Sequence, residues 1–437
     1  MITEAAKFVI TDQIRNGNTN WTQISREVEN STGIKLHRST IQRWYDREGQ
    51  WGVDDTQSGE IDGLDERVKL DKKIATLEGE TKLYKSLYKK AIAKSASTDL
   101  VIKAIKDATE GLPPVKVQKT KKVTAKKKAT HPQTMVCPLS DTHVGDRVLL
   151  EEMNGLNQYN IDIFGRRLYG WTSQIIDLAE LRRNYVEIPH LVVPMLGDMI
   201  SGDIHDELAR TNIDNCMNQM IIGAYMISQA LIRLSGEFED VYVPAVVGNH
   251  GRMTKRVPGK DRNMDWDYML YQWVASFCKN QSNIKFHIPK SPFTIFPAAG
   301  HNILIMHGDS VPGGGSSASM MGVVHKMRTV LQFKETAAVE QLPADLVESR
   351  FEATMMGHFH RVDEFDVGTG QIFVVGTMKG GDEYATNRIH LLTEPKQIAT
   401  YWHPVYGYIG KEIIYLGKYD NAEETFDNVT EGVWANG

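Results

Sequence analysis

Short apolar runs alternate with longer amphipathic stretches from about residue 134 onwards, which is the pattern of strands that alternate with helices. The predicted strands are 134–139, 190–196, 241–247, 302–306 and 353–356, and the predicted helices are 161–183, 209–234 and 266–277. Residues 312–319, PGGGSSAS, predict a flexible loop, and the tail that follows the strand 353–356, as far as Leu416, reads mostly as strand. Because such alternation favours a buried, largely parallel sheet, we expect an α/β fold.

The first 55 residues predict a small all-α module of three helices. Ala5, Phe8 and Val9 lie at helical spacing, Thr22 is the expected cap of the second helix, and a third helix begins at Arg38. The third helix, RSTIQRWY, is rich in polar and basic residues, so the module resembles a helix-turn-helix DNA-binding domain. The residues expected to reach phosphates and base edges are Arg38, Ser39, Gln42, Arg43 and Arg47. A three-helix protein-interaction module with a charged surface is the alternative.

Two segments join this module to the remainder, residues 132–437. Residues 56–112 are helical in pattern, and within 64–94 apolar residues recur every seven positions, a weak coiled-coil seam that predicts a homo-oligomer. A single amphipathic helix on the main body explains the pattern nearly as well. Residues 113–131 hold seven lysines and no acidic residue. We expect a mobile linker that binds phosphate backbones or is simply a solvated tether.

The chain of 437 residues, 41% hydrophobic and 24% charged, has the composition of a soluble globular protein. No basic start precedes an apolar N-terminal stretch, and no apolar run is long enough to cross a bilayer. We therefore expect a cytoplasmic protein with no membrane partner. Cys137, Cys216 and Cys278 are widely spaced and odd in number, which argues against a disulfide framework.

Charge is distributed unevenly along the chain. Residues 1–130 hold 25 Lys and Arg against 18 Asp and Glu, a net of +7, so the remaining residues hold 25 against 37, a net of −12. A basic front joined to an acidic body is typical of a nucleic-acid-facing segment attached to a catalytic domain. DNA is therefore the expected partner, with a solvated basic tail as the alternative.

Metal-binding side chains directly follow five of the apolar runs. The five stretches are SDTHVGD from Ser140, LGDMI from Leu196, VVGNHGR from Val246, IMHGD from Ile305 and MMGHFHR from Met355. Any one of them alone is an ordinary turn, since Asp, Asn and Gly favour such positions. Because the carboxyl ends of parallel strands share one edge of a sheet, the five together predict a common metal site.

Taken in this order, the five stretches resemble the motifs of the calcineurin-like metallophosphoesterase superfamily over roughly residues 134–380. The resemblance implies two facing β-sheets flanked by helices, and a site for two divalent metals. The ligands that it implies are Asp141, His143 and His360 for the first metal and Asn249, His307 and His358 for the second. Asp198 would bridge both metals, and His250 corresponds to the superfamily's catalytic histidine, which is not a ligand.

This set of residues suits the hydrolysis of a phosphoester. Two cations a few ångströms apart lower the pKa of a shared water and polarise the phosphoryl oxygens, so metal-bound hydroxide attacks phosphorus at neutral pH. A nearby histidine protonates the leaving oxygen. The mixed nitrogen and oxygen ligands suit Mn²⁺, Fe or Zn²⁺ better than Mg²⁺ alone, and the resemblance favours Mn²⁺.

The chain departs from the superfamily after GNH, where an acidic residue usually orients the histidine. Here Gly251 and Arg252 follow, so the orientation of His250 is open, and Arg252 becomes a candidate contact for the substrate phosphate. Arg210 is a second candidate. Arg262, Arg361 and Lys379 are further candidates for phosphate contact, although a surface charge is the more common role of each alone. His205 and Asp206 could border the site, although helix capping is the more common role of such a stretch.

The first motif bears on the substrate. SDTHVG is similar to the ADTHLG opening of the repair-nuclease branch of the superfamily, the bacterial SbcD type. Our hypothesis is a DNA nuclease, phage-encoded, that the basic front module tethers to DNA, although the acidic body would repel a duplex outside the site. Two alternatives stay open: a phosphatase or phosphodiesterase acting on small molecules or phosphoproteins, and a DNA-binding or scaffold protein with an inactive phosphoesterase body.

Overall fold

The computed structural model describes two parts of the chain. The described residues are 3–15, 19–48, 115–116, 118–120, 131–205, 207–336, 350–368, 370–389 and 392–428. The chain divides into two compact units, residues 1–95 and 96–437. The coiled-coil seam predicted at 64–94 lies outside the described residues, as does most of the predicted lysine-rich linker.

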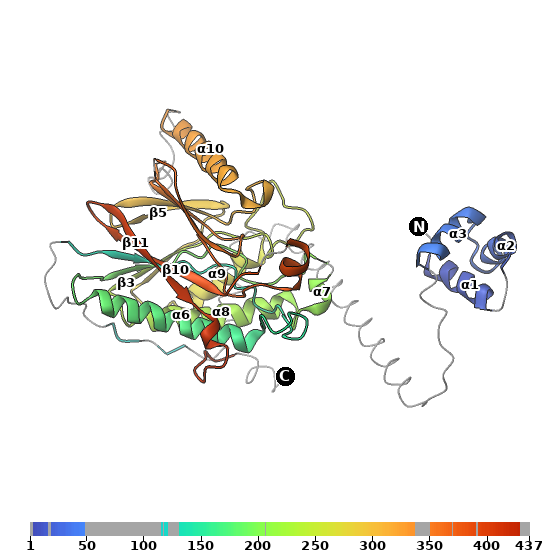
Figure 1. Ribbon diagram of the computed structural model, residues 1–437, viewed down its shortest axis with the longest axis horizontal. Helices are drawn as coiled ribbons and strands as arrows, with labels where there is room; N and C mark the ends of the chain where they lie inside the picture. Colours follow the sequence, from blue (N-terminus) through green and yellow to red (C-terminus); the bar gives the residue numbers. More distant parts are fainter. Residues whose placement is uncertain are drawn as a thin grey trace. The chain divides into compact units, whose positions relative to one another are not determined.

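Within residues 3–48, the described part of the N-terminal unit contains three helices: α1 (Glu4–Arg15), α2 (Trp21–Thr32) and α3 (Arg38–Glu48) (Figure 1). Their shared core is formed by Ala6, Ile10, Ile24, Val28 and Ile41. Two details of the prediction were wrong. Phe8 is 74% exposed, because the buried face of α1 passes through Ala6 and Ile10. The cap of α2 is Asn20, whose side chain accepts hydrogen bonds from the N–H groups of Thr22 and Gln23.

The larger unit is built on two facing β-sheets. Sheet one has the strand order β11-β10-β1-β2-β3-β4, with β1 (Thr134–Val136), β2 (His190–Val192), β3 (Asp240–Pro244), β4 (Ile284–His287), β10 (Lys396–His403) and β11 (Gly407–Tyr415). Its strands β1 to β4 run parallel, whereas β10 pairs with β1 in the antiparallel direction. Sheet two has the order β5-β6-β7-β9-β8, with β5 (Phe293–Ala298), β6 (His301–Met306), β7 (Ala353–Met356), β8 (Val362–Asp366) and β9 (Gln371–Val375).

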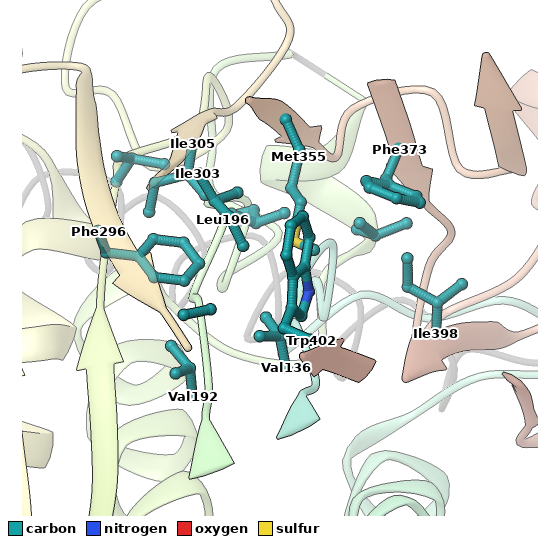
Figure 2. Close-up of a cluster of buried hydrophobic side chains, with 14 residues drawn as sticks. Val136, Val192, Leu196, Phe296, Ile303, Ile305, Met355, Phe373, Ile398 and Trp402 are labelled. Atoms are coloured by element: carbon teal, nitrogen blue, oxygen red, sulfur yellow. The ribbon is translucent and has the colours of Figure 1, made fainter. Parts of the chain in front are cut away.

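The main core lies between the two sheets (Figure 2). On β6, Ile303 and Ile305 face this core, while Leu304 and Met306 face the opposite side of sheet two. This alternation follows from the two-residue period of a strand. From sheet one, Trp402 fills the space between the layers and is 1% exposed. The two-sided burial explains why these strands are almost entirely apolar in sequence.

Helices cover the outer faces of both sheets (Figure 1). In that view α6 (Ile161–Arg182) and α8 (Cys216–Ser235) lie below sheet one, and α10 (Ser317–Thr336) lies above sheet two. The remaining helical segments are α7 (Leu208–Thr211), α9 (Trp266–Phe277), η2 (Gly313–Gly315), η4 (Ala385–Ile389) and η5 (Gly417–Tyr419). None of the helices in the described part of the chain is both long and apolar enough to cross a membrane.

The predicted fold class, an α/β sandwich of two facing sheets preceded by a small all-α module, is confirmed. Helix 209–234 was wrong as a single element. The chain leaves the helical path after α7, and α8 starts anew because the Asn215 side chain accepts from the N–H groups of Met217 and Asn218. The loop predicted at 312–319 is also shorter than expected, since α10 begins at Ser317.

Candidate metal centre

The five motif stretches meet at one edge of the two sheets. Those from Ser140, Leu196 and Val246 follow β1, β2 and β3 of sheet one, and those from Ile305 and Met355 include the ends of β6 and β7 of sheet two. Parallel pairing continues past the strands, since Leu139 bridges to Met195 and Met195 to Ala245. The carboxyl ends of five strands from two sheets therefore face a common space.

The first group of ligating side chains consists of Asp141, His143 and His360. Nε2 of His143 lies 3.1 Å from Nε2 of His360, and Oδ1 of Asp141 lies 3.3 Å from Nε2 of His360. Two imidazole nitrogens that bind one ion at about 2.0–2.1 Å lie roughly 3 Å apart. The observed spacing therefore fits one shared cation.

The second group consists of Asp198, His307 and His358, with Asn249 beside them. Nε2 of His307 lies 3.1 Å from both Oδ2 of Asp198 and Oδ1 of Asn249. The His307 Nδ1–H donates to the carbonyl of Leu196 at 2.7 Å, so Nε2 is the ring nitrogen that faces the other candidate ligands and would bind a metal in place of its proton. This group also offers nitrogen and oxygen donors to a single point.

Asp198 connects the two groups. Its Oδ1 accepts the backbone N–H groups of Asn249 and His250, each at 2.7 Å. Its Oδ2 lies 3.1 Å from Nε2 of His307 in the second group and 4.0 Å from Nε2 of His143 in the first. One carboxylate oxygen thus faces both groups, while the other fixes the carboxylate to the neighbouring loop. This is the arrangement that a bridging ligand requires.

The backbone at the site is held in an unusual conformation. Five of the candidate ligands have positive φ angles: Asp141 (51°), His143 (44°), Asp198 (52°), His358 (69°) and His360 (55°). Each such residue costs of the order of 1–3 kcal/mol, and strain of this kind persists where the surrounding structure over-determines it. Among the described residues only three other non-glycine residues share this conformation, so the strain is concentrated at the site.

Two glycines allow the ligand loops to approach closely. A Cβ atom on Gly248 would lie 2.1 Å from Oδ1 of Asp198, and one on Gly357 would lie 2.4 Å from Oδ2 of Asp141. Any side chain at either position would displace a carboxylate of one of the two groups. The glycines of the GNH and GHxH stretches are therefore required by packing against the ligands.

The electrostatics of the site favour a cation. Burial alone would lower the pKa of His307, but the Asp198 carboxylate beside it raises that pKa to about 10. The negative field that holds a proton on His307 also attracts a metal ion. Burial and the neighbouring His307 lower the pKa of His358 to about 4, and burial lowers the pKa of His143 well below its usual value. Both imidazoles are therefore neutral at pH 7, as a metal ligand must be.

His250 lies beside the first group without joining it. The centroids of the His250 and His143 rings are 4.6 Å apart. The His250 Nδ1–H donates to the carbonyl of Ser201 at 2.8 Å, so the other ring nitrogen, Nε2, is the one available for proton transfer. The sequence left the orientation of His250 open, because Gly251 stands where the superfamily usually has an acidic residue. In the structure a backbone carbonyl orients the ring. The exposed His205 lies next to it, with ring centroids 5.7 Å apart.

The predicted phosphate contacts are occupied by other partners. The Arg252 guanidinium donates to the backbone carbonyls of Asn249, Thr254 and Lys255, so it holds its own loop. Lys379 is 3% exposed and forms ion pairs with Asp146 and Asp382, so it is a buried structural cation. Of the other candidates, Arg262 pairs with Asp309 and donates to the carbonyl of Gly248, Arg361 pairs with Asp363, and Arg210 is exposed on α7. Substrate contact by Arg252 and Arg210 stays a prediction.

The structure also places the residues proposed to bind DNA. Arg38, Gln42 and Arg43 are exposed on α3, and Ser39 is half-buried, with its hydroxyl 2.8 Å from Nδ1 of His37. Arg47 lies in the last turn of the same helix. A spacing of four residues puts Arg38 and Gln42 on one face of the helix, whereas Arg43, five residues after Arg38, lies on a different side. Contact of these residues with DNA stays a prediction.

One group that touches the site was not identified from the sequence. The carboxylate of Asp267, at the start of α9, accepts hydrogen bonds from the N–H groups of Asp198, Met199 and Gly248. The only local signal is the D-W-D stretch before an apolar helix, which reads as an ordinary helix cap. Its link to the site depends on contacts between residues 69 and 19 positions apart.

No family model matches the sequence, and no curated protein matches it. Among solved structures, Vps29 from Entamoeba histolytica complexed with Zn²⁺ is 11% identical, with a TM-score of 0.25 over 64% of this chain and 99% of that chain. An archaeal phosphodiesterase is 10% identical, with a TM-score of 0.29 over 64% and 99%. The phosphopantetheinyl hydrolase of Mycobacterium tuberculosis is 14% identical, with a TM-score of 0.26 over 59% and 93%. Identities and TM-scores this low carry no argument about function.

Proposed function

We propose that this chain is a dinuclear metal-dependent phosphoesterase of the calcineurin-like superfamily, and that it acts as a nuclease on DNA. The observation that carries the proposal is the position of the Asp198 carboxylate, whose Oδ2 faces His143 of one ligand group and His307 of the other. Such a bridge has a purpose only where two cations lie close together.

Each side chain has a defined task in this proposal. Two divalent cations, Mn²⁺ by preference, would lower the pKa of a bound water and neutralise charge on the phosphoryl oxygens. Asp141, His143 and His360 would hold one cation, and Asp198, His307 and His358 would hold the other. His250, oriented by the Ser201 carbonyl, transfers a proton through Nε2 to the leaving oxygen. The left-handed backbone at the ligands keeps these groups in place before substrate arrives.

The choice of DNA is supported by the front of the chain. Residues 1–130 carry a net charge of +7, and α3 presents Arg38, Gln42 and Arg43 on its surface. Such a helix can enter the major groove of a duplex, and lysines that follow it can contact phosphates. The proposal is therefore that the N-terminal unit holds DNA while the metal centre cleaves it.

The alternative is a phosphoesterase that acts on small molecules or phosphoproteins. It is favoured by the net charge of −12 on residues 131–437, which repels a long polyanion from the body. Both versions require the same metal centre. They differ only in what the surface around the centre accepts.

Cleavage assays with a matched pair of variants test the proposal. The wild type, D198N and D162N, which alters an exposed first-turn aspartate of α6, are incubated with Mn²⁺ and either linear or single-stranded DNA or bis-p-nitrophenyl phosphate. We expect the wild type and D162N to cleave both substrates, and D198N to lose about 100-fold or more on each. Ester cleavage without DNA cleavage would favour the alternative. Cleavage of neither substrate, with DNA retained in a gel shift, would favour an inactive DNA-binding protein.

A further inference from the structure

Two of the ligand-bearing loops are fastened to a single buried carboxylate. Asp267 is fully buried, and its Oδ2 accepts the N–H groups of Asp198 at 2.8 Å and Gly248 at 3.0 Å. Its Oδ1 accepts the N–H of Met199 at 3.0 Å. Asp198 and Met199 belong to the loop after β2, and Gly248 belongs to the loop after β3. One side chain therefore ties together the loops that carry the bridging ligand and Asn249.

The start of α9 occupies the space beside the GNH stretch. Asp265 caps this helix, and its Oδ1 accepts the N–H of Asp267 at 2.9 Å. A Cβ atom on Gly251 would lie 2.2 Å from Oδ1 of Asp265 and 3.0 Å from the carboxyl carbon of Asp267. The position after His250 therefore has no room for a side chain, because the carboxylates of Asp265 and Asp267 occupy that space.

We propose that Asp267 is the positioning residue of the metal centre, which fixes the bridging carboxylate of Asp198 relative to Asn249 by holding both of their loops. It supplies from the start of α9 an acidic group that is absent next to His250 in the sequence. The inference rests on the proposed function, since it assigns Asp267 a purpose at the same site. Asp267 itself is buried beneath the two loops, so it supports the candidate ligands without reaching the solvent.

The need for such a brace follows from the backbone at Asp198. This residue has a φ of 52°, a conformation that L-residues rarely adopt, and its loop would relax if nothing held it. The backbone N–H groups of Asp198 and Met199 both donate hydrogen bonds to the Asp267 carboxylate. These two hydrogen bonds fix the peptide groups on either side of the Asp198 Cα atom. The carboxylate is suited to this task because it accepts several N–H groups at once and donates none.

Arg262 provides a second contact that holds Gly248 in place. Its NH2 group donates to the carbonyl of Gly248 at 3.3 Å, and its NH1 group forms an ion pair with Asp309 at 3.0 Å. Asp309 lies two residues after His307. Gly248 is therefore held through its N–H by Asp267 and through its carbonyl by Arg262, which also links it to the loop that carries His307.

The test compares D267N with the matched control D162N. Asp267 and Asp162 are each the second residue of a helix with a capped N-terminus, so both substitutions remove the same charge from the same helix position, but only Asp267 contacts the ligand loops. An asparagine at 267 turns an N–H donor toward at least one backbone N–H. We expect D267N to bind Mn²⁺ about tenfold to 100-fold more weakly in calorimetric titration, and D162N to bind it as the wild type does.

A spectroscopic readout separates positioning from general stability. Two Mn²⁺ ions that share the Asp198 carboxylate give an exchange-coupled electron paramagnetic resonance signal. We expect this coupled signal in the wild type and in D162N, and signals of separate ions in D267N at saturating Mn²⁺. A coupled signal and wild-type affinity in D267N would overturn the inference.

Amide hydrogen exchange tests the brace without metal. In metal-free protein, peptides containing residues 198–199 and 248 should exchange about tenfold faster in D267N than in the wild type or D162N. If the wild type bound no Mn²⁺, the proposed function would fail, while this exchange difference would still support the brace. Equal exchange in all three proteins would overturn it.

A second variant is available if D267N does not fold. R262Q, which releases the Gly248 carbonyl, would then be measured instead. Unchanged Mn²⁺ affinity and unchanged exchange coupling in R262Q would also count against the inference.

Discussion

Nε2 of His143 lies 3.1 Å from Nε2 of His360, although the two residues are 217 positions apart in the chain. His143 follows β1 in sheet one, and His360 follows β7 in sheet two. Their pairing therefore depends on the two sheets facing each other across the core. Two imidazole nitrogens at this distance, beside the carboxylate of Asp141, have the spacing of two ligands that share one cation.

Removing His360 should empty one of the two proposed metal positions. We expect H360A to bind one Mn²⁺ per chain, compared with two for the wild type, because Asp141 and His143 alone offer too few ligands to the first ion. Metal analysis after gel filtration measures the stoichiometry. H325A, which removes an exposed histidine from α10, serves as the control and should retain both ions. Two ions in H360A would show that His360 is not a ligand.

His250 should act on the leaving group and leave metal binding unchanged. Because its Nδ1–H is committed to the Ser201 carbonyl, Nε2 is the ring nitrogen through which a proton would pass to the leaving oxygen. We expect H250A to keep both Mn²⁺ ions and to lose about 100-fold or more in kcat on an ester with a poor leaving group. The loss on bis-p-nitrophenyl phosphate should be much smaller, since p-nitrophenolate departs without protonation. An equal loss on both esters would be inconsistent with a role as general acid.

The Lys379–Asp382 ion pair should make stability sensitive to acid. Burial opposes the charge on Asp382, but Lys379 lowers the pKa of that carboxyl to about 2, below its ordinary value of 3.8. The pair therefore stabilises the fold above about pH 4, and this contribution is lost as the pH falls from about 4 to about 2. Asp146 and Asp382 raise the pKa of Lys379, despite its burial, so this side of the pair is lost only well above pH 10.5.

Urea unfolding of metal-free D382N and wild type measures this effect. We expect D382N to be less stable than the wild type at pH 7, with a difference that shrinks between about pH 4 and pH 2. Metal-free protein is used so that the release of bound metal in acid does not contribute to the measured difference. D363N, which alters a less buried partner of Arg361, provides the comparison. A stability difference that does not depend on pH would contradict the assignment.

Deleting residues 1–130 should separate DNA binding from chemistry. The described ends of the lysine-rich segment lie at the amino ends of the strands of sheet one: Gln118 bonds to Gln281 just before β4, and His131 lies just before β1. The metal centre is at the opposite, carboxyl ends. We expect the truncated protein to hydrolyse bis-p-nitrophenyl phosphate at the wild-type rate, and to bind DNA at least tenfold more weakly with a flatter salt dependence. Unchanged DNA binding would remove the tethering role.

Much of the candidate site could be predicted because its signals are local. Asp141, Asn249 and His358 each follow a short apolar run within a few residues, and the period of that run identifies a strand. The same reasoning located α9 correctly as Trp266–Phe277. It was wrong in detail for α1, where Phe8 was counted among the apolar positions at helical spacing but is exposed, and where the buried Ala6 was not singled out.

Other features were decided only by the packing of distant segments. Lys379 reads in sequence as a cation that could bind phosphate, but the fold buries it between Asp146 and Asp382. Arg252 follows the GNH stretch, which made it a candidate for substrate contact. In the structure its guanidinium donates hydrogen bonds to backbone carbonyls of its own loop. Whether a charged side chain faces solvent, substrate or a buried partner is set by tertiary contacts, and no local pattern records them.

The order of the five stretches, the ligand types at their ends and the alternation of strands and helices were determined by the sequence alone, because each depends on neighbouring residues. The distances from Asp198 Oδ2 to both candidate ligand groups, the left-handed backbone at five candidate ligands and the hydrogen bonds that Asp267 accepts were decided by the tertiary structure. These depend on loops from both sheets meeting at one edge. The free energy of burying the core between the sheets brings those loops together.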